Sequence, residues 1–261
     1  MPNAIQIQEA EILDHQEVAP EHYVRTLDAP EIAAAALPGQ FVMVRALGSW
    51  DPLLPRAYSV YHADEEGGCI EILYREVGRG TASLRRQDIG RYVQLWGPLG
   101  NAFRLPDGDR VVLVGGGVGV PPLVYWAERL AALTAPVEVV ALIGAAREEF
   151  LVGLPHLRRS RAVVRAATDD GSYGHHGYVT ELLPEYLAHA RVNVYACGPM
   201  PMLAAVARIT EAYGVSAELA LEAPMACGVG ACLGCTVPRR SGGYARVCTE
   251  GPVFASTDIA W

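Results

Sequence analysis

The sequence has no cluster of basic residues, and acidic residues outnumber basic ones. Asp and Glu together number 29 against 21 Lys and Arg, which gives a formal net charge of −8 at pH 7. A chain with this balance repels the phosphate backbone of nucleic acids, and it has no basic run that would offset the repulsion locally. We therefore expect no nucleic-acid partner.

Long hydrophobic runs are missing as well. The longest uncharged stretch, residues 111–127, contains four glycines and two prolines, which is typical of a buried strand and loop and not of a membrane span. The first residues, MPNAIQIQEAEILDHQ, have neither the basic segment nor the apolar core of a signal peptide. These absences predict a soluble, cytoplasmic protein with no membrane association.

In such a reducing compartment, the six cysteines are expected to be ligands, catalysts or small buried groups and not disulfides. Two of them are solitary, and four lie close together near the end of the chain with the spacing C-x4-C-x2-C-x12-C. This is the plant-type spacing of the four thiolates that bind a [2Fe–2S] cluster. The predicted metal ligands are Cys227, Cys232, Cys235 and Cys248, the last of which is expected at the end of a later strand, YARVC.

The residues between these cysteines are small, and they support the same interpretation. Gly228, Gly230 and Gly234 allow positive φ and a close approach of backbone N–H groups to the sulfurs. Structural zinc is the alternative because it also takes four cysteines, although its usual pattern is two separated short-spaced pairs.

The periodicity of apolar residues changes twice along the chain and predicts three domains. Residues 1–103 contain short alternating segments with Gly and Pro between them, as in an antiparallel β-barrel. In residues 104–214, apolar strands (110–117, 137–146, 161–170 and 191–199) alternate with helical segments (121–133, 177–190 and 200–214), as in a parallel α/β domain. Residues 215–261 form a small Gly- and Cys-rich C-terminal domain.

The segment RAYSV in the predicted barrel combines a guanidinium, an aromatic ring and a hydroxyl. Arg56 suits a pyrophosphate, Tyr58 suits one face of a flavin ring, and Ser59, or its N–H, suits the edge of the ring. Strand alternation places Arg56 and Tyr58 on one side and Ser59 on the other. Downstream, Gly80 and Thr81 stand at a predicted helix start, where N–H groups favour phosphate.

Two further segments predict a nucleotide site in the α/β domain. GGGVGVPPL follows an apolar strand and opens a helix, so its glycines Gly115, Gly117 and Gly119 can present N–H groups to phosphate. The spacing differs from the G-x-G-x-x-G fingerprint, and an ordinary tight turn is the alternative. Cys197 and Gly198 end another strand, at the sheet edge where open α/β sheets bind ligands.

Taken together, RAYS, GRGT, GGGVGV, ACGPMPM and the cysteine pattern resemble the ferredoxin–NADP⁺ reductase superfamily. The C-terminal segments LEAPMACGVGACLGCTVP and ARVCTEGPVF are more specifically similar to the electron-transfer subunits of class B dihydroorotate dehydrogenase. The resemblance implies an FAD-binding barrel, an NAD-binding domain and a [2Fe–2S] domain, in that order. The FAD contacts that it implies are Arg56, Ala57, Tyr58, Ser59, Leu73, Tyr74, Arg75, Gly80 and Thr81.

The resemblance also implies a function and a partner. Dihydroorotate is oxidised at FMN on a separate catalytic subunit, and electrons pass through [2Fe–2S] and FAD to NAD⁺, within pyrimidine (UMP) biosynthesis. The family forms a heterotetramer with two copies of each subunit, and this chain is expected to supply no catalytic base for dihydroorotate. Two alternatives stay open: a flavin and [2Fe–2S] NAD(P)H reductase that serves a hydrogenase, a transhydrogenase or another acceptor, and a non-catalytic nucleotide-binding module with zinc.

Two departures from the family pattern bear on the partner and the coenzyme. The first motif has Ala57 where Pro is more common, and basic residues that are common near Ala223 and Pro224 are missing. Arg147 and Glu148 follow a strand of the nucleotide domain. The arginine favours a ribose 2′-phosphate, as in NADP, and the glutamate disfavours it, so the choice of NAD rests on the resemblance.

Overall fold

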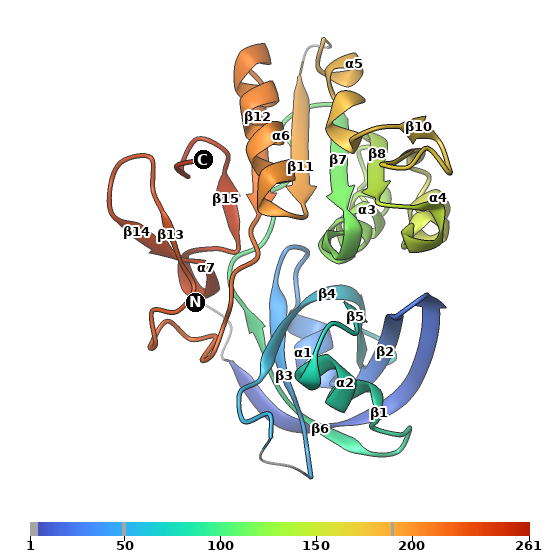
Figure 1. Cartoon of the computed structure of the whole chain (residues 1–261), viewed down its shortest axis with the longest axis vertical. Coiled ribbons are helices and arrows are strands. Elements are labelled where there is room, and N and C mark those ends of the chain that lie inside the picture. The colour runs from blue at the N-terminus through green and yellow to red at the C-terminus, as the bar shows by residue number, and fades with distance from the viewer. Residues whose placement is uncertain (1–4, 49–50, 189–190) are drawn as a thin grey trace.

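The computed structural model describes residues 5–48, 51–188 and 191–261 (Figure 1). The N-terminal part is a closed antiparallel barrel, as predicted, with the strand order β1-β2-β5-β4-β3-β6. Its strands are β1 (Gln6–Ala19), β2 (His22–Asp28), β3 (Phe41–Ala46), β4 (Arg56–Asp64), β5 (Cys69–Arg75) and β6 (Tyr92–Leu99).

Apolar side chains fill the interior of this barrel, and two short helices pack against them. Val60, Ile70, Ile72 and Leu95 are fully buried there, because alternate residues of a strand point to the same side. The helices are α1 (Pro30–Ala35), which buries Ile32, and α2 (Arg79–Arg85), which buries Leu84.

A seven-stranded α/β sheet lies beside the barrel, as the alternation of apolar strands and helices predicted (Figure 1). Its strand order is β10-β9-β8-β7-β11-β12-β15, and every pairing is parallel except the one between β12 and β15. The strands are β7 (Arg110–Gly116), β8 (Glu138–Ala145), β9 (Val163–Thr168), β10 (His175–His176), β11 (Val192–Cys197), β12 (Ser216–Ala220) and β15 (Val253–Ala255).

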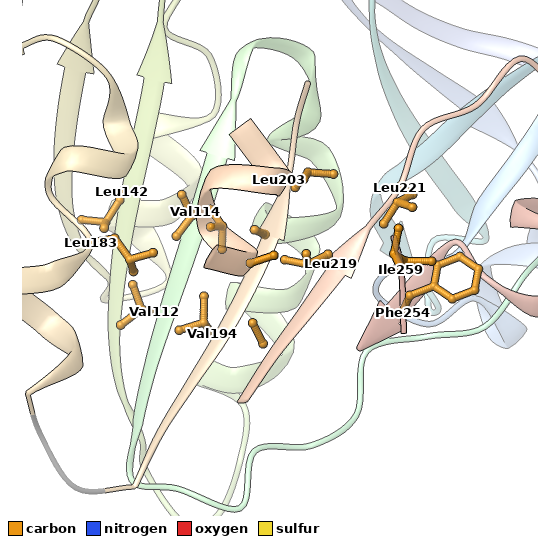
Figure 2. Packing of buried hydrophobic residues seen from close by; sticks show 14 of the residues in the cluster. Val112, Val114, Leu142, Leu183, Val194, Leu203, Leu219, Leu221, Phe254 and Ile259 are labelled. Carbon is orange, nitrogen blue, oxygen red and sulfur yellow. The ribbon is translucent and has the colours of Figure 1, made fainter. Parts of the chain in front are cut away.

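Helices cover both faces of this sheet. The helices α3 (Pro121–Ala131) and α4 (Leu154–Arg159) bury one face, and α5 (Pro184–Leu187) and α6 (Met200–Tyr213) bury the other. Figure 2 shows Val112 and Val114 of β7 on the second face, together with Leu183 and Leu203. Three short 3₁₀ turns complete this part of the chain: η1 (Gly117–Gly119), η2 (Glu148–Phe150) and η3 (Val179–Glu181).

The C-terminal segment continues the core of the α/β sheet. Phe254 and Ile259 pack with Leu221 at the edge of the sheet (Figure 2), because β15 pairs with β12. The same segment contains the two-stranded sheet of β13 (Thr236–Pro238) and β14 (Tyr244–Arg246), followed by α7 (Val247–Glu250). The strands β12 and β15 belong to the α/β sheet although they lie beyond residue 214. The expected domain limits of 1–103, 104–214 and 215–261 stay predictions.

Two predicted elements differ in the structure. Residues 177–190, expected as one helix, form η3 and the short α5, because Pro184 lacks the N–H that would continue a helix; residues 189–190 lie outside the described residues. Cys248, expected at the end of a strand, lies in α7. The Glu250 carboxylate accepts a hydrogen bond from the Arg246 N–H at 2.9 Å, which closes a turn there. None of the helices in the described ranges is long and apolar enough to span a membrane.

Candidate functional site

One cavity of about 1330 Å³ opens between the barrel and the α/β sheet. Strands β4 and β5, the start of α2, the loops after β7, β8 and β11, and the segment after β12 all contribute to its wall. The structure brings all nine residues predicted to contact FAD to this single wall: Arg56, Ala57, Tyr58, Ser59, Leu73, Tyr74, Arg75, Gly80 and Thr81.

Two tyrosines form an aromatic part of this wall. Tyr58 is 9% exposed and packs edge-on against Tyr74, with 5.8 Å between the ring centroids. Burial raises the pKa of Tyr74 to about 12 and raises the pKa of Tyr58 as well, so both phenols are neutral at physiological pH. A neutral, buried pair of rings provides a flat apolar surface on which a planar isoalloxazine ring can pack.

A guanidinium and a glycine lie together at the start of α2. A Cβ atom on Gly80 would lie 2.7 Å from Cζ of Arg56, so only glycine lets this guanidinium approach the backbone. The Thr81 hydroxyl accepts hydrogen bonds from the N–H groups of Val77 at 2.9 Å and Gly78 at 3.1 Å, which holds the turn in place. A guanidinium that lies against the backbone at the start of a helix suits a pyrophosphate.

The predicted dinucleotide residues separate into two groups. Gly117, Gly119 and Gly198 line the cavity, whereas Gly115, the residue before the last of β7, and Cys197, the last of β11, are not among the described residues that line it. Burial raises the pKa of the Cys197 thiol well above its ordinary value, so this thiol is neutral and unsuited to act as a nucleophile. A Cβ on Gly119 would lie 2.5 Å from the Cys197 carbonyl oxygen, so the two loops meet backbone to backbone.

Sequence reasoning did not single out several residues of the wall. Segments far apart in the chain bring them together: Phe150, Tyr178 and Arg208, with Met202 and Glu222, which lie within the ACGPMPM and LEAPMACGVGACLGCTVP segments but have no contact predicted from the sequence. Asp169 also lines the cavity. Arg147 and Glu148 are not among the described residues that line it; Arg147 pairs with Glu149 at 3.2 Å and lies 5.0 Å from the Phe150 ring centroid.

The four clustered cysteines are arranged as two interacting pairs. The Cys227 thiol interacts with that of Cys232, and the Cys235 thiol interacts with that of Cys248, whose backbone N–H lies 3.5 Å from the Cys235 sulfur. Within the described ranges, no three His, Cys, Asp or Glu side chains converge as ligands of one metal ion. Two thiolates for each of two irons is the arrangement that a [2Fe–2S] cluster requires, so these residues fit the predicted group.

Backbone N–H groups surround the sulfurs, as the glycines between the cysteines predicted. The N–H of Gly230 donates to Cys248 Sγ at 3.2 Å, and Gly228 and Gly230 have φ of +70° and +78°. Burial raises the pKa of Cys227, but N–H groups of the loop and the Cys232 thiol outweigh burial and lower it to about 6. The loop therefore favours the thiolate at Cys227, which is the form that binds metal, whereas burial and the neighbouring Cys235 thiol raise the pKa of Cys248 to about 11.

The cluster loop, residues 227–235, lies against the barrel and next to the cavity. A Cβ on Gly228 would lie 2.7 Å from Cγ of Met43, and Met43 on β3 pairs with Ala57 of the cavity wall. Met225 lines the cavity, and the first cysteine of the loop follows it by only two residues. Cys232 is exposed, so the predicted cluster lies between the cavity and the protein surface.

Comparisons with known proteins agree with this geometry. The model of the oxidoreductase FAD-binding domain matches residues 9–103, and that of the iron–sulfur cluster binding domain of dihydroorotate dehydrogenase B matches residues 222–260. The chain is 38% identical over 258 residues to the dihydroorotate dehydrogenase B (NAD(+)) electron transfer subunit of Desulforamulus reducens, covering 97% of this chain and 98% of the relative. The subunit of the same name from Bacillus caldolyticus is 41% identical over 255 residues, covering 93% and 94%.

Two solved structures have the same fold. An NADH-dependent reduced ferredoxin–NADP oxidoreductase, described in connection with flavin-based electron bifurcation, superposes with a TM-score of 0.86 at 27% identity, covering 97% of this chain and 90% of that one. The ferredoxin reductase in carbazole 1,9a-dioxygenase superposes with a TM-score of 0.72 at 25% identity, covering 82% and 68%.

Proposed function

Because the chain belongs to the family of dihydroorotate dehydrogenase B electron-transfer subunits, we propose that it carries electrons to NAD⁺ from a catalytic subunit that oxidises dihydroorotate. It is a flavin and iron–sulfur oxidoreductase subunit of pyrimidine biosynthesis. When bound, FAD exchanges electron pairs as hydride with a nicotinamide, and a [2Fe–2S] cluster exchanges single electrons. The observation that carries the proposal is the single cavity, lined by all nine predicted FAD residues and by three of the predicted dinucleotide glycines.

The chain's own residues supply positions and not acid–base chemistry. Tyr58, Ser59 and Tyr74 hold the flavin ring against the barrel, and Arg56 binds the pyrophosphate. The loops that contain Gly117, Gly119, Cys197 and Gly198 hold the dinucleotide opposite the flavin, with Gly115 supporting the first loop from the end of β7. This arrangement lets a nicotinamide approach the flavin within one cavity.

NAD is the coenzyme that the cavity supports. A carboxylate at the end of a strand accepts hydrogen bonds from the hydroxyls of an adenosine ribose and repels a 2′-phosphate. Asp169 occupies such a position, after β9 and on the cavity wall. Arg147, the residue that argued for NADP, is held by Glu149 outside the wall.

The partner is an FMN-containing catalytic subunit, in a heterotetramer with two copies of each chain. The exposed Cys232 and its exposed neighbours Val229 and Leu233, 45% and 60% exposed, mark the face where single electrons enter. The thiolates of Cys227, Cys232, Cys235 and Cys248 hold the cluster behind this face. Electrons then cross the short segment that joins the cluster loop to the cavity wall.

A different redox partner is the second candidate function. The observation that favours it is the similarity over nearly the whole chain to an NADH-dependent reduced ferredoxin–NADP oxidoreductase. The chemistry at the cavity is the same in both readings, and only the catalytic subunit that docks near Cys232 differs.

The test begins with the protein purified anaerobically. A visible spectrum and metal analysis are expected to show flavin bands with about two irons per chain and no zinc. The protein is then combined with an FMN-containing dihydroorotate dehydrogenase subunit, and dihydroorotate-dependent NADH formation is followed at 340 nm in the assembled complex. A colourless, zinc-containing protein would overturn the function, and a coloured protein that forms no NADH with this subunit would favour the second candidate.

A further inference from the structure

A guanidinium lies inside the barrel without a carboxylate partner. None of the Arg25 side chain, on β2, is exposed to solvent. Its Nη2 donates a hydrogen bond to the Gln87 backbone oxygen at 3.0 Å, and the guanidinium also interacts with the Tyr74 hydroxyl; by geometry, Nε and Nη1 have no hydrogen-bond acceptor within residues 5–48, 51–188 and 191–261. A buried charge that is only partly hydrogen-bonded costs free energy, so its presence calls for a physical explanation.

The strand register places this charge directly behind the aromatic wall of the cavity. Tyr23 pairs with Tyr74 and Arg25 pairs with Ile72 across β2 and β5, so Arg25 and Tyr74 are diagonal neighbours on the inner face of the barrel. Tyr74 in turn packs against Tyr58, and both tyrosines line the cavity. Arg25 is therefore separated from the predicted flavin position by one layer of side chains.

The surrounding groups leave the charge uncompensated. An arginine stays protonated in proteins, and both tyrosines are neutral because burial raises their pKa. Burial and the Arg25 charge lower the pKa of His15 on β1, so this imidazole is neutral at physiological pH. The other charged groups nearby are partly or fully exposed to water, which screens them: Asp88 after α2, Arg85 on α2, which pairs with Glu76, and on the cavity wall Arg56 and Arg75, the latter paired with Glu21.

We propose that Arg25 is an electrostatic positioning residue that raises the reduction potential of the FAD in this cavity, an inference that rests on the proposed function. The oxidised flavin ring is neutral, and it gains two electrons and one proton on reduction, so one negative charge appears on the ring. When the electrons come singly from the partner subunit, the proton comes from solvent, whereas NADH supplies both electrons and the hydrogen together as a hydride. A fixed cation in a medium of low dielectric constant stabilises this new charge but has little effect on the neutral ring.

The experiment measures the midpoint potential of FAD in the full chain, by reductive titration against a reference dye. Arg25→Met removes the charge and keeps most of the volume, whereas Arg25→Lys keeps the charge. Arg85→Met is the matched control, because it removes a cation of the same barrel that is 41% exposed. We expect Arg25→Met to lower the equilibrium constant for flavin reduction at least tenfold, which is about 30 mV for a two-electron couple.

The midpoint potential of Arg25→Lys is expected to lie closer to that of the wild type than to that of Arg25→Met. Arg85→Met is expected to leave the potential unchanged. A folded, FAD-containing Arg25→Met protein with the wild-type potential would overturn the proposal. An Arg25→Lys protein that loses as much as Arg25→Met would also overturn it, because the effect would then be steric and not electrostatic.

If Arg25→Met does not retain FAD, the pH dependence of the wild-type potential decides. A cation behind the wall keeps the reduced ring anionic to a lower pH than in free FAD. The slope of one proton per two electrons should therefore persist to a lower pH in the protein than in free FAD titrated alongside. A change of slope at the same pH in both samples contradicts the inference. Failure of the proposed function is distinguishable, since it appears earlier as a protein without flavin or cluster absorbance.

Discussion

The cavity and the cluster loop prepare their sites in opposite ways. The cavity wall is built from distant segments, and its aromatic part is buried. The cluster site takes three of its four thiols from the nine consecutive residues of the cluster loop and exposes one of them, Cys232, to solvent. Hydride transfer requires two ring systems held in contact away from water, whereas single electrons can enter through a ligand at a partner's surface. Under the proposed function, this difference assigns the cavity to NAD and the exposed cluster loop to the partner.

The largest effect is expected when one cluster ligand is removed, because this change affects the cluster loop and leaves the cavity intact. We expect Cys232→Ser to abolish dihydroorotate-dependent NADH formation in the assembled complex, because two irons then share three thiolates. NADH oxidation by an artificial acceptor should remain partly intact, because it needs only the cavity. Cys69→Ser, at the start of β5 and outside the cluster, is the control and should retain both activities. Equal loss of the two activities in Cys232→Ser would show that the regions do not work separately.

The second effect is confined to the cavity. A Cβ on Gly119 would lie 2.5 Å from backbone atoms of Cys197 and Gly198, so Gly119→Ala must push apart the two loops that hold the dinucleotide. We expect KM for NAD⁺ to rise in the dihydroorotate assay and KM for NADH to rise in the acceptor assay, with flavin and iron content unchanged, and a loss of about 1–3 kcal/mol of unfolding free energy. The control is Gly78→Ala, since no atom lies within 4 Å of the added methyl group there. If KM for NADH in Gly119→Ala equals that of the wild type, these loops do not bind the dinucleotide.

The smallest effect concerns an ion pair that joins the barrel to helix α3. His62 Nδ1 lies 2.7 Å from Glu128 Oε2, and this hydrogen bond raises the pKa of His62 although burial acts against it. A raised folded-state pKa contributes stability that is fully present below about pH 6.5 and is lost as the pH rises through the folded value. Both side chains are partly exposed, so the contribution is about 0.5–1 kcal/mol.

Urea unfolding of the wild type and of Glu128→Gln, measured at several pH values across this range, tests the pair. The stability difference between them should shrink as the pH rises. Glu65→Gln breaks the Arg129–Glu65 pair, at 2.8 Å, on the same helix, and its effect should not titrate in this range because arginine stays charged. A Glu128→Gln difference that is constant with pH would mean that His62 is not protonated in the pair.

The cluster ligands and the FAD contacts are the parts of the site for which sequence reasoning was most useful. The spacing of the cysteines and the RAYS and GRGT segments are local patterns, and the structure places each of the nine predicted FAD residues on one wall. Tyr178 and Arg208 needed the structure, since no short motif links the residue before η3 to a residue of α6. Arg25 looks like an ordinary strand residue in the sequence, and only closure of the barrel makes it a buried charge.

The sequence by itself determined the order of barrel, α/β sheet and cluster loop, because the periodicity of apolar residues and the cysteine spacing act over a few neighbouring positions. The tertiary structure decided that residues 177–190 divide into two short turns, that β12 and β15 join the α/β sheet, and that Gly119 touches the loop after β11. It also decided which charges face the cavity. These features depend on contacts between segments distant in the chain, whose free energies come from burial and close packing and leave no local pattern.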